Sequence, residues 1–336
     1  MTKPMEKQEI LDLMRTFQGP EVVMAAHKLS LFDAIGKKSL SAIDISHKIE
    51  ASVRGCTILL DALVALGLLL KNKERYQNTP VGLKTLCSDG DDTIINSMNH
   101  INELMESWRR LPESVLSGHT NKKLDLQFSE NSEVNRSFIG AMAELGRPNG
   151  RIIAENLNLA SYNKLLDVGG GPGAYCEEIL RVNPQMFGVI ADLPITIESA
   201  RPYVEKGGFA ERISFIAADF YNDPNVELGS NYDVVLISNV LHMEGEVQNR
   251  KLIKKLYNTM EPDGLLIIHE TIISEDHTSP LDRTFFAVNM LVNTQRGNSY
   301  SFNEIKGWLV DAGFGVVEFI DCFENPSLMT AKKIMS

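Results

Sequence analysis

The strongest structural signal in this chain is the segment Leu165-Leu166-Asp167-Val168-Gly169-Gly170-Gly171-Pro172-Gly173. An apolar strand ends at Val168, a run of glycines follows, and residues 175–180 continue as a helix. Glycine lets the backbone turn tightly and lets a ligand approach without meeting a Cβ atom. The helix amino terminus then presents free N–H groups to that ligand. The stretch therefore predicts a nucleotide-type ligand, and its spacing also satisfies the dinucleotide pattern G-x-G-x-x-G/A.

Apolar runs with strand character recur after this stretch, with helical segments between them. Such alternation is typical of a parallel sheet covered by helices on both faces. Two further runs, 315–320 and 328–334, are close together near the carboxyl terminus and are expected to close the sheet edge as a hairpin. The strands predicted for the parallel part are 164–168, 187–191, 213–217, 232–238 and 265–270.

Three acidic positions at the predicted strand ends narrow the ligand. Asp167 precedes the glycines, where a carboxylate repels a pyrophosphate but suits the ammonium and sulfonium charges of S-adenosylmethionine. Asp192 ends the next strand, where it can accept hydrogen bonds from both ribose hydroxyls, as in NAD sites. Asp219-Phe220 ends the third strand, and an acid beside an aromatic ring fits adenine. Each acid alone could be a helix cap, but three after successive strands predict bound S-adenosylmethionine.

The amino-terminal part of the chain has a different pattern. Apolar residues at helical spacing predict helices over 10–17 and 53–70, and 68–76 has the features of a hairpin. Helix, turn, helix and hairpin is the outline of a winged helix, which often binds DNA. The segment 58–63 is mostly apolar, however, whereas a recognition helix needs donors for base edges and phosphates. A packing or dimerisation role is therefore favoured, and residues 94–157 are expected to be helical throughout.

The composition is that of a globular protein with an acidic balance. Hydrophobic residues make up 43% and charged residues 23%, and the net charge of −11 disfavours binding to nucleic acid and anionic membranes. No stretch reaches the ~18 uninterrupted apolar residues that a membrane helix needs, and the first residues lack the apolar core of a signal peptide. We therefore expect a cytoplasmic protein that binds neither nucleic acid nor a membrane.

Metal sites and disulfide bonds are not expected. The cysteines form no C-x-x-C pair and the seven histidines form no H-x-x-x-H or H-E-x-x-H pair. Reduced, mostly buried thiols are the expected state in the cytosol. The four cysteines are Cys56, Cys87, Cys176 and Cys322.

These motifs resemble those of the small-molecule O-methyltransferases, typified by plant caffeic acid and hydroxyindole O-methyltransferases and by bacterial natural-product enzymes. The resemblance covers nearly the whole chain. It implies an α/β fold with a Rossmann-like sheet of seven strands and a mainly helical, winged-helix dimerisation domain that makes the protein a homodimer. The implied boundaries are 1–110 for dimerisation, 111–160 for linking helices that line the acceptor pocket, and 161–336 for the catalytic domain that binds S-adenosylmethionine.

The resemblance also assigns roles to particular positions. His242, just after the fourth strand, matches the catalytic histidine, and Glu270 matches one of two carboxylates that flank it. The positions expected to bind the cofactor are Asp167, Gly169, Gly171, Gly173, Asp192, Leu193, Asp219, Phe220 and Ser238. The positions expected to line the pocket of a small-molecule acceptor, in part from the partner subunit, are Met98, Asn99, Phe138, Met142 and Met290.

The sequence departs from the family pattern in three places. The usual His-Asp-Trp reads His242-Met243-Glu244, the second flanking carboxylate falls at Ser299, and a lysine that often contacts adenine is replaced by Ser238. Cofactor binding is therefore better supported by the sequence than the acid–base apparatus.

Methyl transfer requires mainly that the acceptor is positioned beside the methyl group and that a base can take its proton. Methyl transfer from a sulfonium is an in-line displacement, so the enzyme must hold the nucleophile near the methyl group and exclude water. A phenol ionises near pH 10, so a histidine that takes its proton assists attack. A hydroxyl of a small aromatic molecule is the favoured acceptor, and a carbon or sulfur acceptor that needs no strict base is the alternative. A binding protein that only holds the cofactor, and an NAD-dependent dehydrogenase, are the remaining alternatives.

Overall fold

The computed structural model of the chain describes residues 4–120, 133–320 and 327–334. These residues form two compact units that divide between Asn102 and Glu103, and each is described by itself. Cys56, Cys87 and Cys176 are free, buried thiols, as the sequence predicts, and Cys322 lies outside the described residues. Within the described ranges, no helix combines the length and the apolar character needed to cross a membrane.

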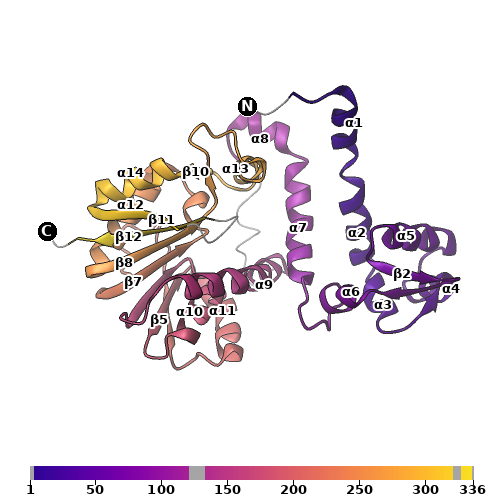
Figure 1. Cartoon of the computed structure of the whole chain (residues 1–336), viewed down its shortest axis with the longest axis horizontal. Helices are drawn as coiled ribbons and strands as arrows, with labels where there is room; N and C mark the ends of the chain where they lie inside the picture. The colour runs from indigo at the N-terminus through magenta and orange to yellow at the C-terminus, as the bar shows by residue number, and fades with distance from the viewer. Residues whose placement is uncertain (1–3, 121–132, 321–326, 335–336) are drawn as a thin grey trace. The chain divides into compact units, whose positions relative to one another are not determined.

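The amino-terminal unit combines short helices with a small antiparallel sheet (Figure 1). The predicted hairpin is confirmed as β2 and β3, and β1 pairs with β3 on its other side. The strands are β1 Leu40–Ser41, β2 Leu69–Asn72 and β3 Arg75–Asn78. The helices are α1 Lys7–Arg15, α2 Gln18–Lys28, α3 Leu31–Ile35, α4 Ala42–Lys48, α5 Val53–Ala65 and α6 Pro80–Thr85.

The helix predicted over 53–70 is too long, because α5 ends at Ala65. Gly67 adopts a left-handed φ of 76°, which glycine reaches without steric cost. The N–H of Gly67 then bonds the carbonyl of Val64, and the N–H of Leu68 bonds that of Leu63. This pair of bonds is the Schellman motif, which satisfies the last carbonyls of a helix and turns the chain away from it.

The carboxyl-terminal unit contains a seven-stranded sheet in the order β11-β12-β8-β7-β4-β5-β6. Five strands are parallel, and β11 and β12 form the antiparallel hairpin predicted at the edge. The strands are β4 Lys164–Val168, β5 Phe187–Asp192, β6 Ile213–Ala217, β7 Tyr232–Ser238, β8 Met260–Glu270, β11 Phe314–Ile320 and β12 Ser327–Lys333. Two short strands, β9 Ile272–Ile273 and β10 Tyr300–Ser301, pair outside this sheet.

Helices cover both faces of the sheet. In Figure 1, α10 and α11 lie on one side of the strands and α12 and α14 on the other. Leu165, Val234 and Ile267 face the first layer, whereas Leu166 and Val235 face the second. Both sets are buried, which explains why the strands appear in the sequence as continuous apolar runs. The helices are α10 Ala174–Val182, α11 Pro194–Gly207, α12 Glu246–Thr259, α13 Leu281–Asn293 and α14 Phe302–Ala312.

The region predicted to be helical throughout, 94–157, is interrupted where the structure describes it. Its helices are α7 Ile95–Trp108, α8 Leu111–Ser117 and α9 Glu133–Asn156. Gly118 ends α8 with a left-handed φ of 80°, and residues 121–132 lie outside the described ranges.

The order of the sheet strands reverses between β4 and β7. β5 and β6 lie on one side of β4, whereas β7 and β8 lie on the other. Ligands of open α/β sheets bind at such a switch point, outside the carboxyl ends of the strands.

Candidate active site

The glycine loop between β4 and α10 forms one wall of the site. Gly169, Gly171 and Gly173 have φ values of 69°, 52° and 84°, a region that other residues avoid. A Cβ atom on Gly169 would lie 2.4 Å from Cγ2 of Val240, so glycine is needed there for space as well. The same position lies 3.6 Å from Cζ of Phe220, which brings this aromatic ring beside the loop.

These contacts lead to a prediction about the loop. We expect Gly169→Ala to lower the free energy of unfolding by about 1–3 kcal/mol, because it combines backbone strain with a steric clash. Gly171 is the matched control: its φ is also positive, but nothing lies within 4 Å of its Cβ position. Gly171→Ala should therefore cost less in urea unfolding, and equal losses in the two variants would contradict the steric argument.

Asp167 is a buried carboxylate at the end of β4. It is 0% exposed, and neither carboxylate oxygen accepts a well-formed hydrogen bond from any residue that the structure describes. Burial, and secondarily the charge of Asp192, raise its pKa to about 7, while a weak contact with the N–H of Cys176 lowers it less. A buried carboxylate without such a partner is costly, so Asp167 is suited to a cationic ligand.

Asp192 ends β5 and holds the glycine loop in place. Its Oδ2 accepts the N–H of Gly171 at 2.9 Å and its Oδ1 accepts the N–H of Leu193 at 2.7 Å. Burial raises the pKa of Asp192, although these N–H groups act against the rise. Asp192, which is predicted to bind the ribose, therefore also links the end of β5 to the loop that follows β4.

Asp219 and Phe220 follow β6 and are both half-buried. The Asp219 carboxylate accepts the backbone N–H of Asn222 at 2.9 Å and its side-chain amide at 3.2 and 3.1 Å. It thus stabilises a local turn and is not the helix cap considered as an alternative, because no helix lies among the described residues between β6 and β7. Phe220 packs at 5.2 Å, centroid to centroid, against the ring of Tyr221.

Ser238, at the end of β7, belongs to a buried polar cluster that sequence reasoning missed. Its Oγ lies 3.0 Å from Nδ1 of His269 and accepts the amide of Asn239 at 3.2 Å. The Asn239 amide also donates to the hydroxyl of Tyr175 at 3.2 Å. Burial lowers the pKa of His269 to about 4, so this imidazole is neutral. The only signal in the sequence was the position of His269 beside Glu270 at a strand end.

His242 and Glu270 form a buried pair. His242 lies on the short 3-10 helix Leu241–Met243 after β7, and Glu270 ends the neighbouring strand β8. Nδ1 of His242 is 2.7 Å from Oε1 of Glu270, and the backbone N–H of His242 donates to Oε2 at 3.3 Å. The N–H of Thr271 also donates to Oε1, at 2.9 Å.

The charge of Glu270 determines which nitrogen of the His242 ring carries the proton. Burial alone would raise the pKa of Glu270, but the charge and hydrogen bond of His242 and the two backbone N–H groups outweigh it and lower the pKa. An ionised Glu270 only accepts, so Nδ1 of His242 carries a proton. The other ring nitrogen, Nε2, forms no hydrogen bond with any residue that the structure describes. The arrangement therefore presents a lone pair on Nε2.

The predicted pocket residues lie in both units. Met290 is buried on α13, one turn after Phe286, whose ring stands edge-on to His242 at a centroid distance of 4.8 Å. Phe138 and Met142 are half-buried on α9. Met98 and Asn99 lie in the amino-terminal unit, where Met98 is buried and Asn99 bonds Nε2 of His27 at 2.7 Å.

The positions that depart from the family pattern have other partners. Glu244 forms two hydrogen bonds with Arg296, at 2.7 and 2.9 Å. Ser299 is fully buried, and its hydroxyl lies 3.4 Å from the carbonyl oxygen of Arg283. Glu270 is thus the carboxylate that contacts the His242 ring among the residues that the structure describes.

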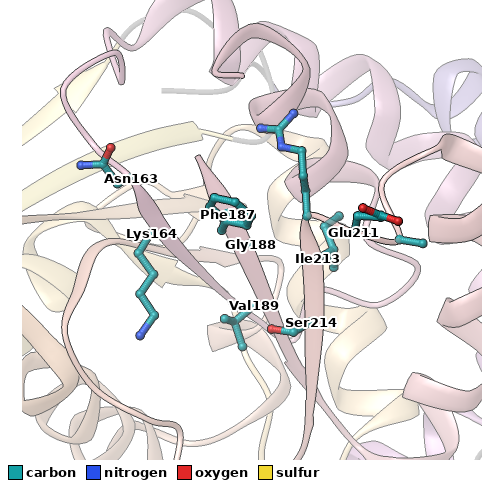
Figure 2. A pocket seen from close by; sticks show the side chains of 10 residues that line it. Asn163, Lys164, Phe187, Gly188, Val189, Glu211, Ile213 and Ser214 are labelled. Carbon is teal, nitrogen blue, oxygen red and sulfur yellow. The ribbon is translucent and has the colours of Figure 1, made fainter. Parts of the chain in front are cut away.

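A pocket elsewhere on the sheet is separate from this site. It is lined by residues such as Lys164, Phe187 and Ile213, which begin β4, β5 and β6 (Figure 2). The glycine loop and the three acids lie at the opposite, carboxyl ends of these strands. The pocket in Figure 2 therefore does not contribute to the chemistry described above.

Comparison with known proteins decides the family of the chain. Residues 118–315 match the O-methyltransferase domain, and residues 11–87 match the O-methyltransferase dimerisation domain. The chain belongs to the O-methyltransferase family. It is a methyltransferase, and the S-adenosylmethionine cofactor predicted from the sequence is confirmed as the methyl donor of this family.

Individual relatives agree with this assignment. The chain is 30% identical over 315 residues to 3-hydroxy-5-methyl-1-naphthoate 3-O-methyltransferase of Streptomyces sahachiroi, which covers 93% of this chain and 90% of the relative. An O-methyltransferase family protein from Burkholderia thailandensis superposes with a TM-score of 0.90 at 25% identity over 99% of both chains. Human N-acetylserotonin methyltransferase, solved with S-adenosylmethionine, shares the fold with a TM-score of 0.85 at 24% identity over 100% of both chains.

Proposed function

We propose that this O-methyltransferase transfers a methyl group to a hydroxyl of a small aromatic molecule, with His242 as general base. The observation that carries the proposal is the 2.7 Å contact between Nδ1 of His242 and the buried Glu270. It leaves Nε2 as the proton acceptor and stabilises the positive charge that the ring gains. This is the arrangement expected of a base that is oriented by a carboxylate.

The residues at the carboxyl ends of β4, β5 and β6 fit the cofactor. The oxygens of Asp167, which accept no well-formed hydrogen bond, suit its cationic methionine end, and the open space at Gly171 admits close approach of a ligand. We assign Asp192 to the ribose and Phe220 to the adenine ring, since both side chains lie beside the glycine loop. When bound, S-adenosylmethionine supplies a methyl group on a sulfonium that leaves as a neutral thioether.

The residues of the chain then handle the acceptor and its proton. The acceptor oxygen would receive that methyl group and lose its proton. The hydroxyl proton passes to Nε2 of His242, and Glu270 stabilises the resulting imidazolium through Nδ1. The buried surroundings of the pair exclude water that would otherwise compete for the proton.

Two observations support an aromatic acceptor. The ring of Phe286 on α13 stands edge-on to His242, and Met290 is buried one turn later on the same helix; methionine adapts well to flat apolar ligands. The Streptomyces sahachiroi relative is named for a hydroxylated naphthoate, and the human relative for N-acetylserotonin. A planar, hydroxylated ring is therefore the proposed acceptor class.

An acceptor panel tests this proposal directly. Phenols, aliphatic thiols, thioethers and carbon acids are offered with S-adenosylmethionine labelled in its methyl group, and the labelled products are identified by mass spectrometry. We expect turnover with phenols, and O-methylated products. Turnover of thiols, thioethers or carbon acids alone would contradict the proposed acceptor and support the alternative of C- or S-methylation.

We further propose that the protein is a homodimer through its amino-terminal unit. Helix α1 buries none of its residues in the described structure, and its apolar side chains recur at helical spacing. Ile10 and Met14 on α1 are 48% and 66% exposed, and Phe17, two residues beyond its end, is 60% exposed. An apolar helix face of this kind is typical of an interface, and it overlaps the segment that matches the dimerisation domain.

Charge on this apolar surface, formed by α1 and Phe17, should disrupt the dimer. We expect Met14→Glu combined with Phe17→Glu to convert the protein to a monomer, measured by light scattering behind size-exclusion chromatography. Val247→Glu is the control, since Val247 is 61% exposed on α12, outside the dimerisation segment. A double variant that elutes with the mass of the wild-type dimer would contradict the assigned interface.

A further inference from the structure

The turn that follows α13 packs directly on the backbone of His242. The N–H of Asn298 donates to the carbonyl oxygen of His242 at 3.0 Å. A Cβ atom on Gly297 would lie 2.3 Å from that same oxygen, so the turn approaches as closely as a glycine allows. The position of the histidine backbone is thus coupled to this turn.

An ion pair joins the same two segments. Nε of Arg296 donates to Oε2 of Glu244 at 2.7 Å, and a terminal nitrogen of its guanidinium donates to Oε1 at 2.9 Å. Such a two-bond geometry fixes orientation as well as distance. The hydrogen bond to Glu244 also raises the pKa of Arg296. The hydroxyl of Tyr300 donates to the backbone carbonyl of Glu244 at 2.5 Å, so both the side chain and the backbone of Glu244 are held.

The backbone of His242 is therefore held from two directions. Glu270 accepts its N–H, and Asn298 donates to its carbonyl oxygen. The family pattern has a second carboxylate at the position of Ser299, but this serine lies against the carbonyl of Arg283. The ion pair between Glu244 and Arg296 links the turn after α13 to residues 242–244, the segment that carries the base.

We propose that Glu244 and Arg296 are positioning residues for His242, and that their ion pair compensates for the missing second carboxylate by fixing the backbone of residues 242–244. The proposal rests on the proposed role of His242 as general base. Neither residue needs to touch the substrate, because the effect passes through the placement of the imidazole. A displacement of a reacting group by about 1 Å can cost up to ~10²-fold in rate.

Arg296→Met tests this role, because methionine keeps an unbranched apolar stem and removes the charge and the paired donors. We expect kcat to fall about tenfold, with the dissociation constant of S-adenosylmethionine within about twofold of the wild-type value. Arg296→Lys should recover only part of the loss, since an ammonium is a point charge that does not reproduce the two parallel hydrogen bonds of the guanidinium. Rates are measured per folded protein, well below the melting temperature, so that a purely structural loss does not lower kcat.

Arg250→Met is the matched control. Arg250 also pairs with carboxylates, Glu246 and Asp311, at a partly exposed position, and these contacts lie on α12 and α14. We expect its kcat to be unchanged. A charge-exchanged double variant, Glu244→Arg with Arg296→Glu, should retain a higher kcat than the product of the single effects predicts. An Arg296→Met kcat equal to that of Arg250→Met, or strictly additive effects in the exchange, would overturn the proposal.

His242→Ala in the same assays separates this proposal from the proposed function. If His242→Ala is inactive while Arg296→Met turns over like the wild type, the base is correct and the positioning role is wrong. If His242→Ala retains full turnover, no base exists to be positioned, and both proposals are overturned.

Discussion

His242→Ala should lower kcat by about 10²–10⁴-fold while leaving the affinity for S-adenosylmethionine within about twofold of the wild-type value. The reason is the separation of roles in the structure. His242 is held by Glu270 and stands against Phe286, whereas the glycine loop and the acids that fit the cofactor lie at the ends of other strands. Loss of the imidazole therefore removes the proton acceptor but not the cofactor site. Turnover is measured by single-turnover transfer of labelled methyl, and affinity by calorimetric titration.

Glu270→Gln sharpens the interpretation of that result. The amide keeps the shape of the side chain but not the charge that stabilises the imidazolium and fixes the tautomer. We expect kcat to fall less than in His242→Ala, by about 10–10³-fold. His277→Ala is the control, because His277 also contacts a carboxylate, Glu304, but is 40% exposed in its side chain. Unchanged turnover in His242→Ala would contradict the general-base role.

Asp167→Asn should weaken cofactor binding by about 10²-fold or more and yet stabilise the cofactor-free protein above pH 7. The pKa of Asp167 is raised from an ordinary 3.8 to about 7. The folded protein therefore holds this proton more tightly than the unfolded chain does. The contribution of this bound proton to the free energy of unfolding is fully present below the ordinary pKa and is lost as the pH rises through about 7. At pH 8 the wild-type protein carries a buried charge, whereas the amide has none.

The pH dependence distinguishes this effect from a general change in packing. The gain in unfolding free energy of Asp167→Asn over the wild type should reach about 2–4 kcal/mol at pH 8 and shrink towards pH 5. Urea unfolding at both pH values measures it. A gain of the same size at pH 5 and pH 8 would show that Asp167 does not titrate as its surroundings indicate.

Cofactor affinity should also depend on pH through the ionisation of Asp167. A cation binds to the charged form of Asp167, so below pH 7 binding must release a proton and weakens up to tenfold per pH unit. The α-amino group of the cofactor stays protonated over this range. Titration calorimetry in buffers of different ionisation enthalpy should therefore detect proton release at pH 6 in the wild type and none in Asp167→Asn. Equal proton release in the two proteins would show that the cofactor is not bound through Asp167.

Local patterns were sufficient for most of the sheet. The predicted bounds of β4, β6 and β7 match the structure residue for residue. β4 and β7 are buried parallel strands and therefore continuous apolar runs, whereas β6 lies at the sheet edge and is partly exposed but still mainly apolar. The start of β8 was predicted too late, at 265, since its first residues, Met260–Gly264, include Glu261, Pro262 and Asp263 and pair only at Met260 before the register shifts. The helix over 53–70 was predicted too long because Gly67 was not treated as a stop.

The strand–glycine–helix unit, the acid at each strand end, the family and the cofactor could be predicted from the sequence, since they depend on residues that are close together in the chain. The tertiary structure decided which groups meet. The bond between His242 and Glu270 spans 28 positions and that between Glu244 and Arg296 spans 52. Only the folding of separate strands and turns against one another brings such residues together. Likewise, the raised pKa of Asp167 depends on complete burial, which no local pattern specifies.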